Sequence, residues 1–405
     1  MKRVLLITQY FYPENFKSND IAFELVKNGY KVDALVGIPN YPEGKYYKGY
    51  GLCKRRYETF KDVNIIRVFQ FPRGKKANGI KLALNYFSYA FTASIYGLLL
   101  SFFFKYDCII VHAPSPITQA IPAVLLKKLR KIPFHIWVLD IWPDALKSGG
   151  KIQSPFILNN VNRLVESVYN NSSKILISSK GFKDLINKKG NHSDKIVYFP
   201  NWSDDIHTMK KLPVPPLPEG YKIIMAGNLG SAQRLDLIFK TILELKGNKE
   251  LKWIFIGNGS KRDWLIEEIK KHSLDETVFV LGRFHPDYMP SFFNSADALL
   301  ITLKADFPHL RAVVPARLQT YLASGKPILG MIDGGAADII KEANCGYCVN
   351  ADDYKELSKV ISTKVLMDKW SFQELGRNGR KYYLSNFTKE NCINHLIEII
   401  ENKNG

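Results

Sequence analysis

Short apolar runs recur through the second half of the chain, and each is followed by glycine or charged residues. Most then lead into apolar residues at helical spacing, which is the pattern of a strand that enters a helix. Such runs in succession favour repeated βα units and a parallel sheet. The runs are residues 221–226, 253–256, 278–281, 298–301 and 327–332.

The first half of the chain alternates in the same way. A helix is expected over residues 20–28, closed by Gly29 after its last turn. We therefore predict an α/β protein with two Rossmann-like, doubly wound domains, residues 1–205 and 206–384. The proline-rich stretch 212–218 is typical of a stiff linker near their boundary. The strands predicted in the first half are 4–8, 31–36, 64–69, 108–112, 134–139 and 174–178.

A glycine loop follows the run 221–226, with the sequence Gly227-Asn228-Leu229-Gly230. Such a loop between a strand and a helix favours phosphate binding, because backbone N–H groups and the positive end of the helix dipole converge there. Ligands of parallel sheets lie at the carboxyl ends of the strands. Gly257, Arg283 and Gly334 follow other strands, so we expect them at the same edge.

One segment, residues 82–104, is long and apolar enough to span a bilayer. However, the strand at 108–112 must rejoin the sheet begun by residues 4–8, which places both flanks of the segment on one side. We therefore expect a helix that partly faces the membrane interface, and a buried helix is the alternative. The basic residues that precede it and suit anionic lipid are Arg73, Lys75, Lys76 and Lys81.

Charge narrows the choice of partners. Lys and Arg number 57 against 38 for Asp and Glu, which gives a net charge of +19. Such an excess predicts an anionic partner, such as nucleic acid, anionic lipid, or a nucleotide or diphosphate substrate. No nucleic acid is expected, because the basic residues are widely spread and match no RNA- or DNA-binding motif.

The five cysteines form no disulfide framework and fit a reducing cytosol.

Several strings in a fixed order carry a family resemblance. They are Gln9–Asn15, Gly37–Lys45, Trp142–Asp144, Phe199–Trp202, Gly227–Gly230, and Val314–Arg317 followed by Ala323–Pro327. Over nearly the whole chain, they resemble family 4 glycosyltransferases. More closely, they are similar to the branch of fucosamine, colanic-acid and O-antigen transferases (WbuB-like).

This resemblance implies the GT-B fold, in which two Rossmann-like domains face a central cleft and a last helix, here 385–405, crosses back to the first domain. It also implies retaining transfer from a UDP-sugar, without a metal or other cofactor. The sugar would be an N-acetylated deoxyhexosamine or a hexose. The acceptor would be a polyprenyl-diphosphate-linked glycan of a capsule, O-antigen (lipopolysaccharide) or exopolysaccharide. Such an enzyme would be cytoplasmic and peripheral on the inner face of the cytoplasmic membrane, against anionic lipid.

The same resemblance implies the donor-binding residues. The candidates are Gly227, Asn228, Gly230, Arg234, Gly257, Arg283, Phe284, Arg317 and Gly334. The leaving diphosphate must be neutralised, and without Mg²⁺ this falls to N–H groups and cationic side chains. The arginine and lysine that many family members carry in the glycine loop are replaced here by Asn228 and Gln233. We therefore favour Arg317 over Arg234 as the cation at the diphosphate.

A second departure concerns two family glutamates that contact the donor. Their places fall on Ala312 and Thr320, and neither side chain can accept a charge-assisted hydrogen bond. The donor contacts must therefore differ from those of the wider family. Candidate replacements are His309, Arg311 and Gln319.

Two residues at strand ends are candidates for catalysis. His112 ends the run 108–112 and could hydrogen-bond a sugar or move a proton, although a structural histidine is the alternative. Asp140 follows the run 134–139 and could assist the acceptor hydroxyl, with helix capping as the alternative. The residues expected to face the acceptor are Glu14, Asn15, Asn40 and Tyr41.

Two other functions stay open at this stage. A nucleotide-sugar 2-epimerase shares the fold but needs no lipid acceptor and no apolar basic patch. A non-catalytic glycan- or lipid-binding subunit is suggested by Ala312 and Thr320. Binding to anionic vesicles would favour the transferase over the epimerase, and consumption of a nucleotide sugar would exclude the subunit.

Overall fold

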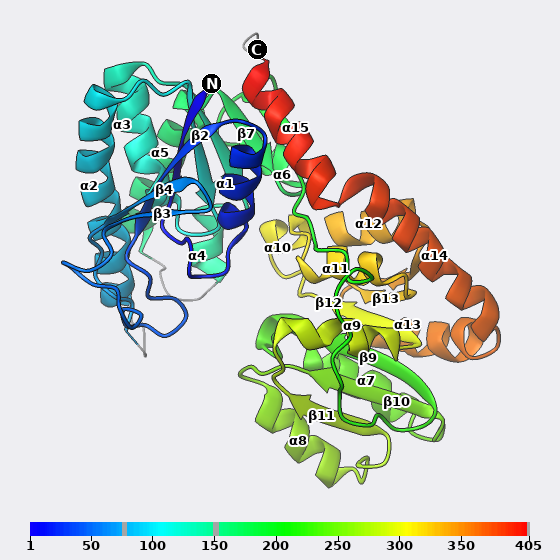
Figure 1. Ribbon diagram of the computed structural model, residues 1–405. Coiled ribbons are helices and arrows are strands. Elements are labelled where there is room, and N and C mark those ends of the chain that lie inside the picture. Colours follow the sequence, from blue (N-terminus) through cyan, green and yellow to red (C-terminus); the bar gives the residue numbers. More distant parts are fainter. Residues whose placement is uncertain (75–78, 149–153, 403–405) are drawn as a thin grey trace. The chain divides into compact units, whose positions relative to one another are not determined.

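The computed structural model describes residues 1–74, 79–148 and 154–402. It contains two compact α/β units, each with its own sheet (Figure 1). The first unit comprises residues 1–199 and the segment from Ile393 on, and the second comprises Pro200–Cys392. These limits differ by a few residues from the predicted boundaries, because the segment just after residue 200 bonds to helices of the second unit.

An eight-stranded sheet forms the first unit, in the order β3-β4-β2-β1-β5-β6-β7-β8. Neighbouring strands are parallel except for β3 and β4. The central strands are buried along most of their length, as expected for parallel strands with helices on both faces. The strands are β1 (Arg3–Thr8), β2 (Lys31–Gly37), β3 (Tyr57–Phe60), β4 (Val63–Val68), β5 (Cys108–Ala113), β6 (Phe134–Val138), β7 (Lys174–Ile177) and β8 (Ile196–Tyr198).

Helices connect these strands, and α2 and α3 lie side by side along the sheet (Figure 1). The helices of this part of the chain are α1 (Lys17–Lys27), α2 (Gly79–Phe103), the 3₁₀ helix η1 (Ile117–Ala120), α3 (Ile121–Arg130), α4 (Asp144–Ser148), α5 (Pro155–Asn171) and α6 (Phe182–Asn187).

The second unit has a six-stranded, wholly parallel sheet in the order β11-β10-β9-β12-β13-β14. The predicted α/β class with two parallel sheets is confirmed. The strands are β9 (Tyr221–Ala226), β10 (Leu251–Ile256), β11 (Val278–Gly282), β12 (Ala298–Thr302), β13 (Ile328–Met331) and β14 (Gly346–Val349). The helices are η2 (Ser231–Gln233), α7 (Leu235–Glu244), α8 (Arg262–Lys271), η3 (Pro286–Tyr288), α9 (Met289–Asn294), α10 (Pro308–Ala312), α11 (Arg317–Ser324), α12 (Gly335–Glu342), α13 (Tyr354–Val360), η4 (Ile361–Val365), α14 (Lys369–Asn386) and α15 (Lys389–Glu401), which runs on into the first unit.

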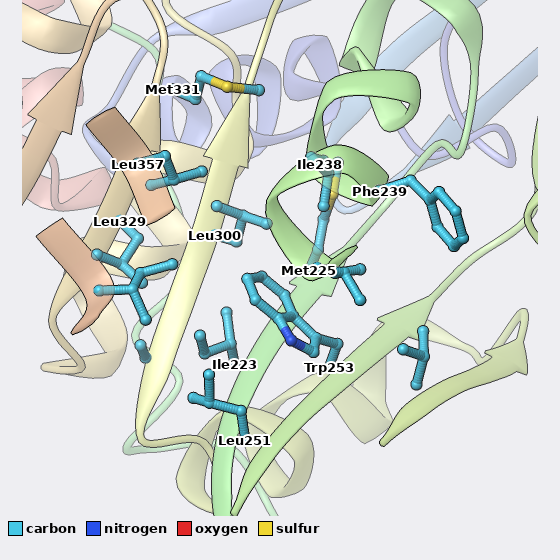
Figure 2. Close-up of a cluster of buried hydrophobic side chains, with 14 of the residues drawn as sticks. Ile223, Met225, Ile238, Phe239, Leu251, Trp253, Leu300, Leu329, Met331 and Leu357 are labelled. Atoms are coloured by element: carbon cyan, nitrogen blue, oxygen red, sulfur yellow. The ribbon is translucent and has the colours of Figure 1, made fainter. Parts of the chain in front are cut away.

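Alternate residues of the same strands enter two apolar clusters, one on each face of this sheet. Ile223 and Met225 of β9 pack with α7, α8 and α13, whereas Ile224 and Ala226 pack with α9, α11 and α12. Figure 2 shows the first cluster, where the Trp253 ring of β10 lies beside Ile223. Because each strand is held from both sides, the loops at its carboxyl end start from fixed positions.

Helix α2 exposes an apolar stripe and packs through small or polar residues. Asn85, Ala93 and Gly97 are turned inward, and a Cβ on Gly97 would lie only 3.2 Å from Leu126 of α3. Among the described residues, α2 alone is long and apolar enough to cross a bilayer, and 28% of its most apolar stretch is buried. Its large exposed side chains are Ile80, Leu84, Phe87, Phe91, Ile95, Leu99, Phe102 and Phe103. Lys75 and Lys76 lie outside the described residues.

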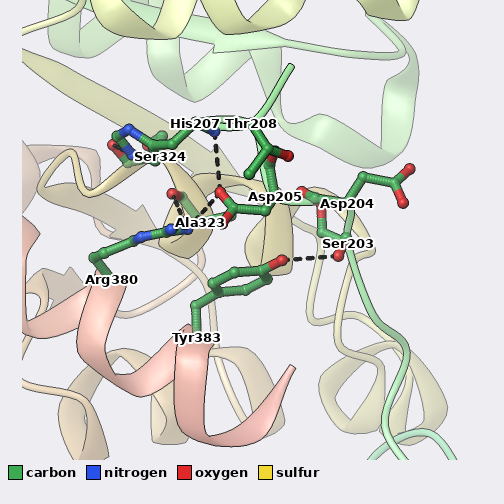
Figure 3. Close-up of polar contacts among 9 residues, drawn as sticks. All are labelled: Ser203, Asp204, Asp205, His207, Thr208, Ala323, Ser324, Arg380 and Tyr383. Atoms are coloured by element: carbon green, nitrogen blue, oxygen red, sulfur yellow. Dashed lines mark hydrogen bonds and ion pairs between the residues drawn. The ribbon is translucent and has the colours of Figure 1, made fainter. Parts of the chain in front are cut away.

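A polar clamp holds the segment that enters the second unit (Figure 3). The Asp205 carboxylate accepts two hydrogen bonds from the Arg380 guanidinium, at 2.8 and 2.7 Å. Arg380 also donates to the Ala323 carbonyl oxygen at 3.1 Å, and the Tyr383 hydroxyl donates to the Ser203 carbonyl oxygen at 2.9 Å. The clamp therefore fixes the linker to both α11 and α14.

Replacing Arg380 by glutamine is expected to destabilise the protein by about 1–3 kcal/mol, because a part-buried carboxylate loses its charged partner. Burial by itself would raise the pKa of Asp205, but hydrogen bonds from Arg380 and the His207 N–H outweigh burial and lower it. The ionised Asp205 therefore stabilises the folded protein above the ordinary aspartate pKa of about 3.9. This stabilisation is lost as the pH falls through the lower pKa of the folded state. Urea unfolding at neutral and acidic pH measures this difference.

The matched control is Arg377→Gln, which breaks an exposed pair with Glu374 on the same helix and is expected to cost at most about 0.5 kcal/mol. An equal cost for the two variants, or a difference that survives at acidic pH, would contradict the role of the clamp.

Candidate functional site

Two glycine loops meet backbone to backbone at the carboxyl edge of the second sheet. Gly227 follows β9 with φ +129°, and Gly257 follows β10 with φ +146°, values that favour glycine. A Cβ on Gly257 would lie 1.8 Å from the Gly227 carbonyl oxygen. Any side chain at Gly257 would therefore force the two loops apart.

Most N–H groups of the Gly227–Gly230 loop are already used within the protein. Those of Gly227 and Leu229 donate to the backbone of residues 256–258, at 2.8 and 2.9 Å. The Gly230 N–H donates to the Gln233 Oε1 at 3.1 Å. The described loop therefore offers few free N–H groups to a phosphate, contrary to expectation. Gln233, at the place where many family members have lysine, accepts one of these N–H groups. A side chain must supply most of the charge.

Arg317, the first residue of α11, lies beside this loop. Its guanidinium carbon is 3.6 Å from the position of a Cβ on Gly227. One nitrogen, Nη1, is buried and has no hydrogen-bond partner within the described residues. A buried cationic donor without a partner is costly, so an arriving anion would be bound favourably. Arg317 is therefore the candidate anion ligand at this edge.

Arg234, the alternative cation, is surrounded by carboxylates. Its Nη1 lies 2.6 Å from Asp352 and 3.8 Å from Asp306, and its Nε lies 3.5 Å from Asp236. These carboxylates already balance its charge, which leaves Arg317 better placed than Arg234 to meet a diphosphate.

The remaining donor candidates differ in exposure. Asn228 and Arg283 are exposed at the ends of β9 and β11. Phe284 packs edge-on against Phe292, with ring centroids 4.9 Å apart. Gly334 has φ +61°, and a Cβ there would lie 2.0 Å from a backbone oxygen of α10, so this position also requires glycine.

Gly334 lines a cavity of about 460 Å³ at the carboxyl ends of β13 and β14, a size in the range of small-molecule sites. Arg311, Asp333 and Lys341 give it a polar wall. Asp352 also lines this cavity and binds Arg234 next to the glycine loop, so the cavity adjoins that loop.

The two positions that replace the family glutamates have other roles here. Ala312 is buried at the end of α10. The Thr320 Oγ1 lies 3.0 Å from the Ser203 Oγ, so Thr320 bonds to the linker. Of the candidate replacements, Gln319 is buried and its Oε1 has no partner within the described ranges, whereas Arg311 is exposed.

His112 is buried inside the first unit. Its Nδ1 lies 3.4 Å from the Thr8 Oγ1, and its ring centroid lies 5.2 Å from that of Trp137. Burial lowers its pKa to about 3, so the imidazole is neutral near neutral pH. Its Nε2 has no partner among the described residues. The side chain is thus a neutral hydrogen-bonding group rather than a cationic acid.

Asp140 follows β6 and is half-buried. Burial raises its pKa to about 6. No hydrogen bond or ion pair to its carboxylate occurs among the described residues. The next helix, α4, begins only at Asp144, so Asp140 does not cap it. An unpartnered carboxylate at a strand end is free to accept a proton.

The loops after β1 and β2 are tied together by the predicted acceptor residues. The Glu14 Oε1 accepts the N–H groups of Asn40 and Tyr41, at 2.7 and 2.6 Å. The Asn40 Oδ1 accepts the Arg73 N–H at 3.2 Å. Glu14 and Asn40 are buried and shape these loops, whereas Asn15 and Tyr41 are exposed.

Sequence reasoning missed the surroundings of Arg73. The tyrosine rings of Tyr10, Tyr41 and Tyr86 lie around its guanidinium, at 5.9, 5.2 and 5.9 Å. These tyrosines come from two loops and a helix, so no local pattern joins them. The only signal was the unusual aromatic content of the two loops.

Among the described residues, no cluster of His, Cys, Asp or Glu suits a metal ion.

Residues 208–382 match the family model described as Glycosyl transferases group 1, which covers most of the second unit. The second unit is therefore similar to the group 1 glycosyltransferases over this range. This match supports the predicted glycosyltransferase family, and the WbuB-like branch stays a prediction. No curated protein matches the sequence significantly.

Solved structures extend the likeness to both units. Sucrose-phosphate synthase from Thermosynechococcus elongatus matches with a TM-score of 0.74 at 12% identity, over 98% of each chain. Anabaena HepE in complex with UDP matches with a TM-score of 0.69 at 13% identity, over 99% of each chain. A glycosyltransferase from Rickettsia africae matches with a TM-score of 0.67 at 14% identity, over 100% of this chain and 99% of that chain. At such identities the likeness shows the fold, which is GT-B, as predicted.

Proposed function

We propose that the protein is a family 4, retaining glycosyltransferase that moves a sugar from a UDP-sugar, without a metal, to a polyprenyl-diphosphate-linked glycan. The product would belong to a capsule, O-antigen or exopolysaccharide. The observation that carries the proposal is the unpartnered Arg317 Nη1 beside Gly227 in a unit similar to the group 1 glycosyltransferases. The UDP complex of HepE, which has the same fold, supports UDP as the nucleotide.

In this proposal the donor diphosphate lies beside Gly227 and Arg317. As the bond from the anomeric carbon to the diphosphate oxygen breaks, negative charge grows on the leaving phosphate. A guanidinium already in place stabilises that charge without reorganisation. The adjoining cavity, with Arg311 and Gly334, would receive the sugar.

Asp140 is the proposed proton acceptor. The acceptor hydroxyl attacks the anomeric carbon on the face from which UDP leaves, so the configuration is retained. The hydroxyl proton passes to the Asp140 carboxylate as UDP departs. A pKa of about 6 keeps this carboxylate mostly ionised at neutral pH, yet more basic than an ordinary aspartate. The neutral His112, on the neighbouring strand β5, would hydrogen-bond the acceptor through its unpartnered Nε2.

Thermal unfolding with UDP, GDP, ADP, CDP and TDP, each with Mg²⁺ or EDTA, tests the nucleotide. UDP is expected to raise the midpoint equally with and without Mg²⁺, since a ligand at a hundredfold excess over its Kd adds about 2.7 kcal/mol of stability. Stabilisation by another nucleotide alone would contradict the UDP assignment. If no nucleotide stabilises the protein, the non-catalytic subunit becomes the better hypothesis.

We further propose that the exposed stripe of α2 lies on the anionic inner surface of the membrane. Phe87 and Phe91 are exposed on α2, which carries Lys81 in its first turn. Arg73 contacts Tyr86, the residue before Phe87. Exposed aromatic and basic residues on one helix suit a lipid interface.

The double variant Phe87→Ser/Phe91→Ser is expected to bind phosphatidylglycerol vesicles at least about tenfold more weakly, because two apolar side chains no longer enter lipid. Vesicle sedimentation measures the binding. Trp370→Ser, which removes an exposed aromatic residue of the second unit, is the control and should leave binding unchanged. An equal loss in both variants would contradict the assignment to α2.

A further inference from the structure

Tyrosines surround one cation at the amino-terminal end of α2. The Arg73 Nη1 donates to the Tyr10 hydroxyl at 3.2 Å, and its Nη2 lies 3.5 Å from the Tyr86 hydroxyl. The Tyr41 ring centroid is 5.2 Å from the guanidinium carbon. Ring faces attract a cation and orient its planar group. We call Tyr10, Tyr41, Arg73 and Tyr86 the Arg73 cage.

The charge of Arg73 is not balanced by an ion pair with any residue that the structure describes. Glu14 is the acid that interacts with Arg73 over a longer distance. Burial raises the pKa of Glu14 to about 7, although N–H groups of the neighbouring loop and Arg73 oppose this shift. Glu14 is therefore partly neutral at neutral pH, and the cage keeps a positive charge.

The cage offers several hydrogen-bond donors to an anion. Burial raises the pKa values of Tyr10 and Tyr86, so both hydroxyls keep their protons at neutral pH. Because Arg73 donates to these oxygens, their own protons can point to another acceptor. A planar guanidinium with neighbouring hydroxyl donors matches the several oxygens of a phosphate or diphosphate.

The cage lies beside the amino-terminal half of the apolar stripe of α2. Tyr86 belongs to α2, and the next residue, Phe87, is 58% exposed. The inward Asn85 accepts a hydrogen bond from the Gln9 Nε2 at 2.8 Å and donates to the Phe71 carbonyl oxygen. These bonds fix both the loop after β1 and the segment before Arg73 to α2. An anionic group held by the cage would thus lie beside the surface that we place on lipid.

We propose that the Arg73 cage binds the diphosphate of the lipid-linked acceptor, at the point where its polyprenyl chain enters the bilayer. This inference rests on the proposed function, since it assumes a lipid-linked acceptor. The cage would hold the acceptor by the part common to all polyprenyl-diphosphate glycans, and the neighbouring loops would contact the sugars. Phosphate oxygens also occur in bilayer headgroups and in free pyrophosphate, so the test must separate these sources.

Calorimetric titration of the full chain in detergent micelles provides the test. The probes are farnesyl diphosphate, farnesol and inorganic pyrophosphate, with UDP titrated separately. Farnesyl diphosphate is expected to bind at least about tenfold more tightly than farnesol or pyrophosphate. Arg73→Gln should weaken farnesyl diphosphate about 10- to 100-fold, because a charge-assisted pair is lost, while UDP binding stays unchanged.

Matched variants guard against a folding artefact. Tyr86→Phe keeps the ring and removes one donor, and it should weaken farnesyl diphosphate by about three- to tenfold. Arg55→Gln is the control, since Arg55 is an exposed arginine of the same unit with a tyrosine ring 5.4 Å away. It should change none of the affinities.

Several results would overturn the proposal. One is unchanged farnesyl diphosphate affinity in Arg73→Gln, and another is equal binding of pyrophosphate and farnesyl diphosphate. A third is that Arg73→Gln weakens binding to phosphatidylglycerol vesicles but not to farnesyl diphosphate, which would make the cage a headgroup site. If the wild type binds farnesyl diphosphate through Arg73 but binds no UDP, the cage is supported and the transferase proposal fails.

Discussion

Replacing Arg317 by glutamine is expected to lower kcat by about 10²- to 10³-fold, the usual cost of removing a group that stabilises a leaving anion. Glutamine keeps the aliphatic stem and a polar amide, but it is shorter than arginine and the charge beside Gly227 is lost. Arg317→Lys should be faster than Arg317→Gln, because lysine restores the charge although it lacks the bidentate geometry of the guanidinium. UDP release, measured with membranes that contain lipid-linked acceptor, reports the rate.

Arg377→Gln, at an exposed position of α14, is the control and should keep full activity. The decisive comparison is Arg234→Gln. Because three carboxylates already surround Arg234, its loss should slow the reaction less than the loss of Arg317. A larger effect at Arg234 would move the cation site to that residue.

Asp140→Asn is expected to lower kcat by about 10²- to 10⁴-fold, the range for removal of a general base. Burial raises the pKa of Asp140 to about 6, and only the ionised form can accept a proton. The wild-type rate should therefore fall as the pH drops below about 6. The variant should lack this acidic limb. A pH profile of UDP release tests both statements.

Asp140→Asn should lower the activity but raise the stability of the protein at neutral pH. The folded-state pKa of Asp140 lies above the unfolded value, so the folded protein binds this proton more tightly. The associated stability is present below about pH 4 and is lost as the pH rises through about 6. Asp140→Asn should thus be more stable than the wild type at neutral pH. Asp144→Asn is the nearby control, and loss of activity together with loss of stability in Asp140→Asn would indicate a structural role instead.

The strands were largely predictable because buried parallel strands read as apolar runs. Residues 298–301 became β12 (Ala298–Thr302), and 174–178 became β7 (Lys174–Ile177). Strand β4 (Val63–Val68) was predicted as residues 64–69, but its antiparallel partner β3, and therefore the hairpin, was missed. Its turn uses Lys61 and Asp62 at φ 48° and 59°, where the usual sequence signal is Asn-Gly or Asp-Gly.

The site was less predictable, because its properties depend on residues distant in the sequence. The glycines could be placed, since a loop after a buried strand has few other options. Nothing near Arg234 indicated that Asp306 and Asp352 would meet it from the ends of β12 and β14. Burial of His112 likewise depends on contacts such as that with Trp137, from the next strand of the sheet.

The second unit begins and ends at neighbouring points. Ser203, near its start, donates its N–H to the Phe387 carbonyl oxygen near its end, at 3.3 Å, and also pairs with Thr388. A domain with adjacent ends can be cut out and replaced with little disturbance to its host. Residues 203–388, which end before α15 begins, thus form an exchangeable cassette. Under the proposed function, transplanting the equivalent segment of a relative should change which activated sugar is used and leave the recipient's acceptor preference unchanged, so that donor choice could evolve independently of the glycan.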